Sequence, residues 1–588
     1  PLLARDESGA LRKRMEEAVD GEYQAYKTHG GAYTREHFFG KYPESAALVE
    51  GMSDEDVYNL NRGGHDPYKI YAAYHAAVNH KGQPTVILAK TVKGYGTGAG
   101  EAQNKTHQIK VLDMDSLKEF RDRFDVEFND EELKKLPFYR PASDSVELRY
   151  LNERRGSLGG FMPTRRTECE TLAVPELGMF GSFLESSGER EMSTTMAFVR
   201  MLNVLIKQKG IGDHVVPIVP DEARTFGMEG MFRQLGIYSA VGQLYKPEDS
   251  AQVMYYREDK QGRILEEGIN EAGAMSAWIA AATSYSVNGK AMVPFFIYYS
   301  MFGFQRIGDL AWAAGDAQAR GFLLGATAGR TTLNGEGLQH QDGHSHILAS
   351  TIPNCVSYDP TYAYELAVIF HDGLKRMYEN KENVFYYITL MNENYTHGAM
   401  PKGAEEGILK GMYLLREGND PGSKTRVQLL GSGTILREVE AAAEMLWSIF
   451  NVSADIWSVT SFNELRKEGM EAERWNLLHP DSEPRVPYVT KVLRGRKSPV
   501  VAATDHIRAY ADQIRPYIRN HFTTLGTDGF GRSDSREKLR HFFEVDRYFI
   551  TVAALNALAD KGLIGRSKVA DAIKRFGINP DKPFPVKV

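Results

Sequence analysis

The chain has 588 residues, of which 42% are hydrophobic and 25% charged, and its formal net charge is −6. These values are typical of globular proteins, and the length allows about three or four domains. The slightly acidic balance gives no reason to expect nucleic acid or an anionic membrane as a partner, and no apolar run approaches the roughly 20 residues that span a bilayer. The two cysteines cannot build a disulfide framework, so a reducing compartment fits the composition.

Residues 1–165 are typical of the C-terminal part of an α/β domain followed by a linker. Asp66 and Pro67 predict a helix start, with an N-cap and a proline at the first helical position. Pro84 to Val92 is a continuous apolar run rich in β-branched residues, which predicts a buried parallel strand. A glycine-rich turn, Lys93 to Gly98, follows at the place where open α/β sheets bind ligands.

The polar segment Glu101 to Lys110 has no hydrophobic periodicity and predicts an irregular loop. His107 lies in this loop. From these residues alone, an exposed histidine without a role is the preferred interpretation. Residues from about 110 to 190 are charged and poor in long apolar runs, which indicates a linker and peripheral helices.

Residues 166–404 predict a doubly wound α/β domain. A helix begins at Ser193, and His214 to Pro220 is expected to form the next strand. Asp221 and Glu222 follow this strand directly. Acids at the end of a strand that alternates with helices fit a parallel sheet with a ligand site at its carboxyl edge.

Glu271 begins a run of small residues, Ala272 to Ser284, that predicts a buried helix without a polar face. A carboxyl group at the edge of such a helix would be desolvated, which suits it to proton transfer. The alternative is that Glu271 only interacts with the dipole at the helix N-terminus. Helical periodicity alone favours this alternative.

Residues 405–588 predict a further α/β unit. The expected strand Arg426 to Leu430 runs into Gly431-Ser432-Gly433-Thr434 and a helix, and Ala454 to Val459 and Val500 to Thr504 predict two more strands. The glycine-containing turn lacks the lysine of a phosphate loop and the full dinucleotide fingerprint. We therefore do not assign it to phosphate binding.

A histidine-rich loop follows the middle of the chain. The residue types of His340, Asp342, His344 and His346 suit zinc. Their spacing matches no common zinc signature, however, and Gly343 indicates a turn. We predict no metal site at these four residues.

An aromatic cluster closes the apolar run that starts at Val293. Its members are Tyr298, Tyr299, Phe302 and Phe304. Aromatic residues at the end of a buried strand are usually part of the core. The composition alone assigns them no further role.

Three longer strings carry a specific resemblance. They are Asp221 to Gly230, Tyr298 to Asp309 and Gly335 to His340. Together with Gly-Ile-Asn-Glu before the small-residue helix, they resemble the pyrimidine-binding domain of transketolase-type thiamine-diphosphate enzymes. Over essentially all 588 residues the chain resembles the bacterial, homodimeric type of pyruvate dehydrogenase.

The resemblance implies an α/β fold of consecutive doubly wound, mostly parallel-sheet domains. Residues 1–165 would be the end of the diphosphate-binding domain and a linker. Residues 166–404 would form the pyrimidine-binding domain. Residues 405–588 would form the C-terminal domain, whose role in this superfamily is largely dimerisation.

The resemblance also implies roles for acids and aromatic residues of the middle domain. Glu271 would exchange a proton with the pyrimidine ring of the cofactor, and Glu222 would support it through a polar network. Phe302 would stack on the pyrimidine, and Tyr299 would form part of the site wall.

Further roles fall on two histidines and their neighbours. His340 would donate or accept a proton beside the reactive ring, with Glu336 in the same cavity. His107 would guide the lipoyl group of a partner subunit. Lys93 would contact the cofactor at the glycine-rich turn.

The activity that the resemblance implies is oxidative decarboxylation of pyruvate in the bacterial cytoplasm. A homodimer would use thiamine diphosphate and Mg²⁺ and pass the acetyl unit to the lipoyl group of dihydrolipoyl acetyltransferase. It would also contact the subunit-binding domain of that partner. Two alternatives stay open: another enzyme of the superfamily, such as transketolase or 2-oxoglutarate dehydrogenase, and a catalytically silent dimerisation or complex-binding fragment.

One departure from the family pattern concerns the metal. The family binds magnesium and diphosphate through Gly-Asp-Gly and a later asparagine, and no Gly-Asp-Gly occurs in this sequence. We expect these ligands to precede Pro1, in a chain truncated at its N-terminus. The chain alone would then carry the pyrimidine half of the site, without metal ligands, and would bind thiamine diphosphate weakly and be inactive.

Overall fold

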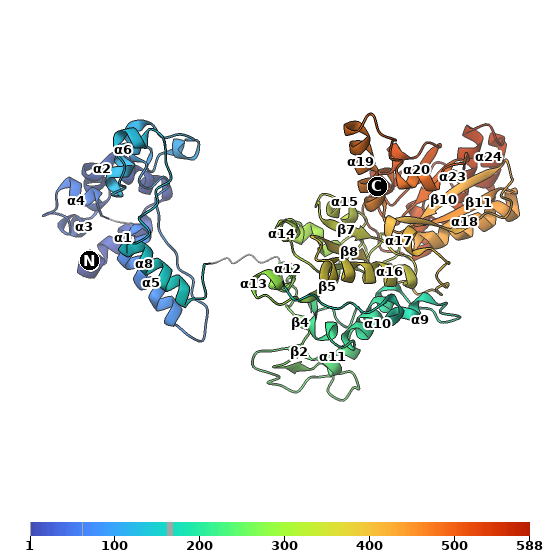
Figure 1. Cartoon of the computed structure of the whole chain (residues 1–588), viewed down its shortest axis with the longest axis horizontal. Coiled ribbons are helices and arrows are strands. Elements are labelled where there is room, and N and C mark those ends of the chain that lie inside the picture. The colour runs from blue at the N-terminus through green and yellow to red at the C-terminus, as the bar shows by residue number, and fades with distance from the viewer. Residues whose placement is uncertain (1, 61–62, 162–168) are drawn as a thin grey trace. The chain divides into compact units, whose positions relative to one another are not determined.

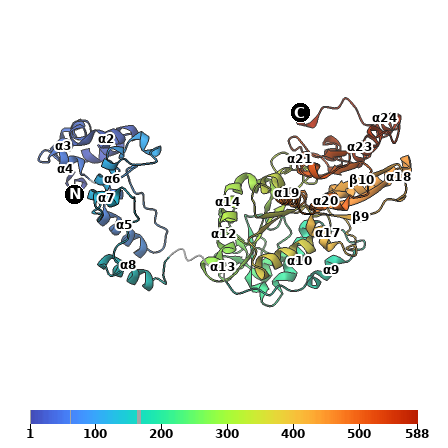
Figure 2. The same cartoon turned by 45° about the horizontal axis from the view of Figure 1, so that its top comes forward.

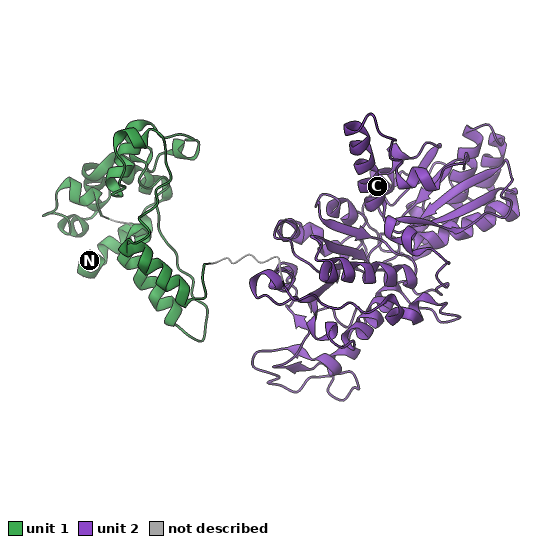
Figure 3. Ribbon diagram, in the orientation of Figure 1, with its two compact units in different colours: residues 1–161 green, residues 162–588 purple. Residues whose placement is uncertain are grey.

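The computed structural model describes residues 2–60, 63–161 and 169–588 (Figure 1). The chain divides into two compact units, residues 1–161 and 162–588 (Figure 3). No helix in these described ranges is both long and apolar enough to cross a membrane.

Unit 1 is helical. Its α-helices are α1 (Ala10–Glu17), α2 (Asp20–His37), α3 (Pro43–Ala47), α4 (Asp54–Tyr58), α5 (Pro67–Asn79), α6 (Met114–Arg123), α7 (Asp130–Leu133) and α8 (Val146–Ser157). Asp66 caps α5 as predicted, because its carboxylate accepts hydrogen bonds from the backbone N–H groups of Tyr68 and Lys69. A small core lies between α1, α2 and α4, where Leu11, Tyr26 and Val57 are buried.

The predicted strand Pro84 to Val92 is wrong. The described residues of unit 1 contain no β-strand, so this segment has no neighbour with which to form a sheet. Val86 and Leu88 are 83% and 92% exposed. An apolar, β-branched run becomes a buried strand only where other strands and covering helices are present.

The first sheet of unit 2 is wholly parallel, in the order β4-β1-β5-β6-β8-β7. Its strands are β1 (Val215–Val219), β4 (Leu265–Glu266), β5 (Val293–Tyr299), β6 (Phe322–Ala326), β7 (Cys355–Tyr358) and β8 (Phe385–Thr389). Side chains of β5 alternate between two cores, with Phe295 and Ile297 in one and Phe296 and Tyr298 in the other. This alternation shows that both faces of the sheet are covered, as predicted for a doubly wound fold.

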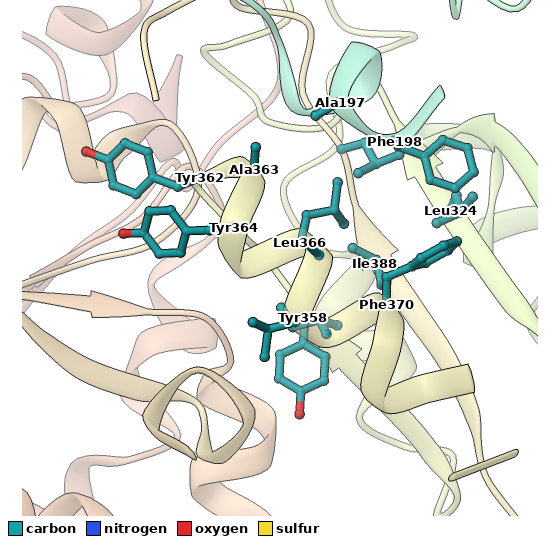
Figure 4. Close-up of a cluster of buried hydrophobic side chains, with 14 of the residues drawn as sticks. Ala197, Phe198, Leu324, Tyr358, Tyr362, Ala363, Tyr364, Leu366, Phe370 and Ile388 are labelled. Atoms are coloured by element: carbon teal, nitrogen blue, oxygen red, sulfur yellow. The ribbon is translucent and has the colours of Figure 1, made fainter. Parts of the chain in front are cut away.

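Helices cover the two faces of this sheet. Figures 1 and 2 show α12 (Glu271–Ala282) beside α14 (Phe304–Asp316), and Trp278 of α12 packs in the same core as Phe296. On the other face lie α10 (Thr194–Ile206) and α16 (Ala363–Leu374). Figure 4 shows Phe198 of α10 and Phe370 of α16 meeting near Leu324 of β6.

The second sheet of unit 2 has the order β13-β12-β10-β11-β9, with β9 antiparallel. Its strands are β9 (Met412–Arg416), β10 (Arg426–Gly431), β11 (Ser453–Val459), β12 (Val500–Ala503) and β13 (Phe522–Leu525). Val427 and Leu429 face the large core shared with the first sheet, whereas Leu430 faces a separate core. The α/β fold class predicted for this region is therefore confirmed.

The remaining helices of unit 2 are mostly short or peripheral. They are α9 (Gly181–Leu184), α11 (Gly230–Leu235), α13 (Ser284–Val287), α15 (Ser345–Ala349), α17 (Glu405–Lys410), α18 (Ile435–Phe450), α19 (Phe462–Leu478), α20 (Tyr488–Val492), α21 (Arg508–Asp512), α22 (Arg536–Phe542), α23 (Arg547–Asp560) and α24 (Arg566–Arg575). A two-stranded parallel pair joins β2 (Ile237–Tyr238) to β3 (Glu258–Asp259). This pair encloses residues 239–257.

The small-residue helix begins at Glu271 as predicted, but it is not buried all round. Asn270 caps it by accepting a hydrogen bond from the N–H of Gly273 at 3.1 Å. Ala272, Ser276 and Ala280 form an exposed stripe at helical spacing. Small side chains gain little free energy from burial, so a run of them does not by itself fix which face is covered.

Phe370 tests the large core. Its side chain is fully buried, with ring centroids 5.1 Å from Phe295 and 5.0 Å from Phe322. We expect Phe370→Ala to lower the free energy of unfolding by about 3–5 kcal/mol, because it leaves a cavity in a packed core. Denaturant unfolding followed by near-UV circular dichroism measures the loss. Phe530→Ala is the matched control, since Phe530 is 73% exposed; equal effects of the two changes would contradict the assigned core.

Candidate active site

The candidate site of unit 2 is built at the carboxyl edge of the six-stranded sheet. Strands β4, β1, β5 and β6 are parallel, so the segments that follow them leave at the same edge. The predicted site residues stand on these segments: Glu271 after β4, Glu222 after β1, Tyr299 and Phe302 at the end of β5, and Glu336 and His340 after β6. The sheet thus brings residues from four segments of the chain to one edge.

Glu271 is held by an arginine that sequence reasoning missed. Its carboxyl is buried, and both carboxylate oxygens accept from Nη1 of Arg306, at 2.9 and 3.0 Å. The guanidinium of Arg306 also lies over the ring of Phe302, 4.3 Å from its centroid. Arg306 lies in the first turn of α14, whereas Phe302 ends the 3₁₀ turn before that helix, so no helical spacing predicted their contact.

His340 lies between the two aromatic residues assigned to the site. Its ring meets Tyr299 edge-on at a centroid distance of 4.9 Å and Phe302 at 5.0 Å. Nδ1 of His340 is 3.5 Å from the carboxylate of Glu336 and is buried without a hydrogen-bond partner. The histidine therefore has a ring nitrogen available to a group in the site.

The aromatic cluster divides into core and site residues. Tyr298 and Phe304 are buried in the core beneath the edge, at 0% and 5% exposure. Tyr299 and Phe302 are only partly buried. The second pair is the one that contacts His340.

Glu222 lies in a desolvated, electronegative environment. Burial raises the pKa of its carboxyl, and the negative charges of Asp221 and Glu271 raise it further, against two backbone hydrogen bonds that lower it. Burial also raises the pKa of the Tyr299 hydroxyl, with Glu336 and Glu222 among its charged neighbours. Glu222 and Glu271 thus interact electrostatically, as the proposed polar network requires.

Asp342 organises the histidine-rich loop from within. It is 1% exposed and accepts hydrogen bonds from the backbone N–H groups of His344 and Ser345 at 2.9 and 3.0 Å. The hydroxyls of Ser300 and Ser345 also donate to it. Its oxygens are therefore already used in holding the loop.

Two predicted site residues lie in unit 1, where they contact each other. Nζ of Lys93 is 2.8 Å from Nδ1 of His107, and both side chains are exposed. The loop is fixed by buried Glu101, which accepts from the backbone N–H of Gly96 at 3.0 Å and from Arg123 at 2.7 Å. Residues Asn104–His107 form a 3₁₀ turn within the predicted loop. That Lys93 and His107 belong to the same site as Glu271 stays a prediction.

Comparison with known proteins follows the same division of the chain. The pyruvate dehydrogenase E1 component middle domain family matches residues 172–398, and the transketolase-like C-terminal domain family matches residues 411–546. The structure is similar to transketolase from Campylobacter jejuni, with a TM-score of 0.57 and 16% identity over 92% of this chain and 75% of that one. A transketolase from Pichia stipitis gives a TM-score of 0.58 and 15% identity over 90% and 70%.

Relatives of known sequence are much more similar. The chain is 64% identical to the pyruvate dehydrogenase E1 component of Pseudomonas aeruginosa and 58% identical to that of Escherichia coli K12. These matches cover 100% and 99% of this chain, and 66% of each relative's length. The matches extend over both units. The chain therefore belongs to the family of pyruvate dehydrogenase E1 components.

Proposed function

We propose that the protein catalyses the thiamine-diphosphate-dependent oxidative decarboxylation of pyruvate. The acetyl unit passes to the lipoyl group of dihydrolipoyl acetyltransferase. The observation that carries the proposal is the buried carboxyl of Glu271 at the carboxyl edge of the sheet. Arg306 contacts both this carboxyl and the ring of Phe302. Pyruvate is proposed as the substrate because the chain belongs to the pyruvate dehydrogenase E1 family.

The residues present fit the pyrimidine part of thiamine diphosphate. A buried carboxyl and a partly exposed aromatic ring offer a hydrogen-bonding group and a stacking surface side by side. When bound, the cofactor supplies the carbanion chemistry of the reaction. Glu271 holds a proton at a ring nitrogen, and Glu222, whose pKa is raised by burial, supports it through a polar network.

The remaining residues position the substrate and exclude water. His340 exchanges a proton with the reacting keto acid, and the carboxylate of Glu336, 3.5 Å from Nδ1, orients the imidazole. Tyr299 closes the wall behind the histidine. Lys93 contacts the cofactor, and His107 guides the incoming lipoyl group. We propose Mg²⁺ as the ion that accompanies the diphosphate and assign it to no described residue of this chain.

The proposed assembly is a homodimer that binds the acetyltransferase in the bacterial cytoplasm. The exposed stripe Ala272, Ser276 and Ala280 supports a dimer, because small side chains let a second backbone approach closely. We also propose the three-domain division 1–165, 166–404 and 405–588. Product analysis with pyruvate, 2-oxoglutarate and ketose phosphates as competing substrates tests the activity: preference for another substrate would overturn the proposal.

Glu271→Gln tests the acid. In the full-length protein we expect turnover to fall by about 10²–10⁴-fold, the usual scale for a general acid–base group. The fold should survive, because the amide has nearly the same shape and its oxygen still accepts from Arg306. Steady-state decarboxylation with an artificial electron acceptor measures the loss. Exposed Glu405→Gln is the control; a loss within a few-fold of that control would remove Glu271 from its assigned role.

His107→Ala tests the separation of the two half-reactions. We expect decarboxylation with an artificial acceptor to persist, since Glu271 and the aromatic residues are untouched. Acetylation of the lipoyl domain should fail, because His107 is the group assigned to guide the lipoyl group and to protonate its opening disulfide. Both activities are measured on one preparation. Equal losses would place His107 in decarboxylation, and no loss would restore the exposed histidine without a role.

Glu222→Gln tests whether the pKa of the Glu222 carboxyl is raised in the folded protein, and it does so without any substrate. A carboxyl whose folded-state pKa is raised destabilises the fold once pH rises above that pKa, and this cost is absent where the group is protonated in both states. We expect Glu222→Gln to raise the melting temperature at about pH 8 and to have a vanishing effect near pH about 4. Exposed Glu483→Gln is the control. A stabilisation independent of pH would contradict the assignment.

A further inference from the structure

Three fully buried ionisable side chains meet where the two sheets of unit 2 join. Asp359 directly follows β7 of the first sheet, and His506 follows β12 of the second. His346 lies on α15, at the end of the histidine-rich loop. All three residues are 0% exposed. Groups of this kind are rarely buried unless they are paired or bind a metal ion.

Four polar atoms of this group have no hydrogen-bond partner. They are Nδ1 of His346, Oδ2 of Asp359 and both ring nitrogens of His506. One ligand atom from each residue lies within 4.8 Å of the others. Leaving a buried polar atom unsatisfied costs about 1–3 kcal/mol, so several together indicate a missing partner.

Thr389 determines which nitrogen of His346 is free to bind. Its hydroxyl donates to Oδ1 of Asp359 at 2.7 Å and lies 2.9 Å from Nε2 of His346. A hydroxyl has a single proton, so once that proton is given to Asp359 the oxygen accepts from Nε2–H. Nδ1 of His346 then carries the lone pair, which is the form that ligates a metal. Hydrogen bonds of this type to the far nitrogen are usual behind metal-bound histidines.

His506 and Asp359 are spaced like two ligands of one ion. Nε2 of His506 is 3.4 Å from Oδ2 of Asp359. Two atoms bound at about 2.0–2.1 Å to a tetrahedral zinc lie roughly 3.4 Å apart. A bare His506–Asp359 ion pair would leave both Nδ1 of His346 and Nδ1 of His506 unsatisfied, whereas a shared ion leaves only the second.

We propose that His346, Asp359 and His506 bind a zinc ion that joins the two sheets of unit 2. Two imidazoles and one carboxylate suit zinc, while magnesium and calcium favour sites made of oxygen alone. Three protein ligands leave a fourth position for a water molecule. The ion would connect segments that are far apart in the sequence, which gives it a structural role.

Metal analysis of the untagged, full-length protein tests the proposal. We expect about one zinc per chain after growth with zinc, and cobalt(II) added to the metal-depleted protein should give the visible bands of a tetrahedral nitrogen and oxygen site. Zinc should raise the melting temperature of the depleted protein, because an ion that binds only the folded state stabilises it. Excess magnesium should not displace it.

Variants separate this site from adventitious binding. His506→Asn should abolish the cobalt bands and the zinc-dependent rise in melting temperature, and His344→Asn, in the same loop but outside the group, should keep both. Thr389→Val retains all three ligands and should weaken zinc binding about 10–100-fold. If His506→Asn does not fold, the wild-type titration and Thr389→Val still decide. No bound metal and no cobalt bands in the wild-type protein, or identical binding in His506→Asn, would overturn the proposal.

Discussion

The parallel alignment of β4, β1, β5 and β6 is the constraint on which the rest of the site depends. Parallel strands force each connection to cross the sheet, so successive segments return to the same carboxyl edge. Glu222, Glu271, Phe302 and His340 come from different parts of the chain and meet because of this alignment. The register of β5 also matters. A shift of one residue would turn Tyr298 and Tyr299 each to the face that the other now occupies, and Tyr299 would no longer lie beside His340.

Arg306 adds an electrostatic condition to this geometry. It bonds both oxygens of Glu271 and covers one face of Phe302, yet half of its side chain is exposed. A ring that stacks on that face and bonds to Glu271 must displace the guanidinium. The displaced arginine regains water because half of it is exposed, whereas the buried Glu271 needs a new hydrogen-bond partner in its place. The buried carboxylate is then left to the ligand that replaces the arginine.

The sequence predicted local features well and long-range pairing poorly. Helix starts at Ser193 and Glu271 and strands near 215–219 and 426–431 depend on capping and apolar runs, which are local. The run 84–92 has the same apolar signature but no strand partners in unit 1, and periodicity cannot report partners. Arg306 was not predicted, because Phe302 ends a 3₁₀ turn and Arg306 lies in the following helix α14. Asp359 and His506 had no signal at all, since they meet through the packing of one sheet on the other.

That packing gives residues 405–588 a part in the candidate site. Asp505, just after β12, accepts from the backbone N–H groups of Thr331 and Thr332 at 2.8 and 3.0 Å. Buried Arg330 donates to the carbonyls of Thr527 and Gly529, in the segment Gly526 to Ser535. These contacts hold the segments that follow β12 and β13 against residues 330–332, in the loop that leads to His340. The position of His340 between Tyr299 and Phe302 therefore also depends on residues of the second sheet. A disturbance of the junction between the two sheets would move the imidazole of His340 within the candidate site.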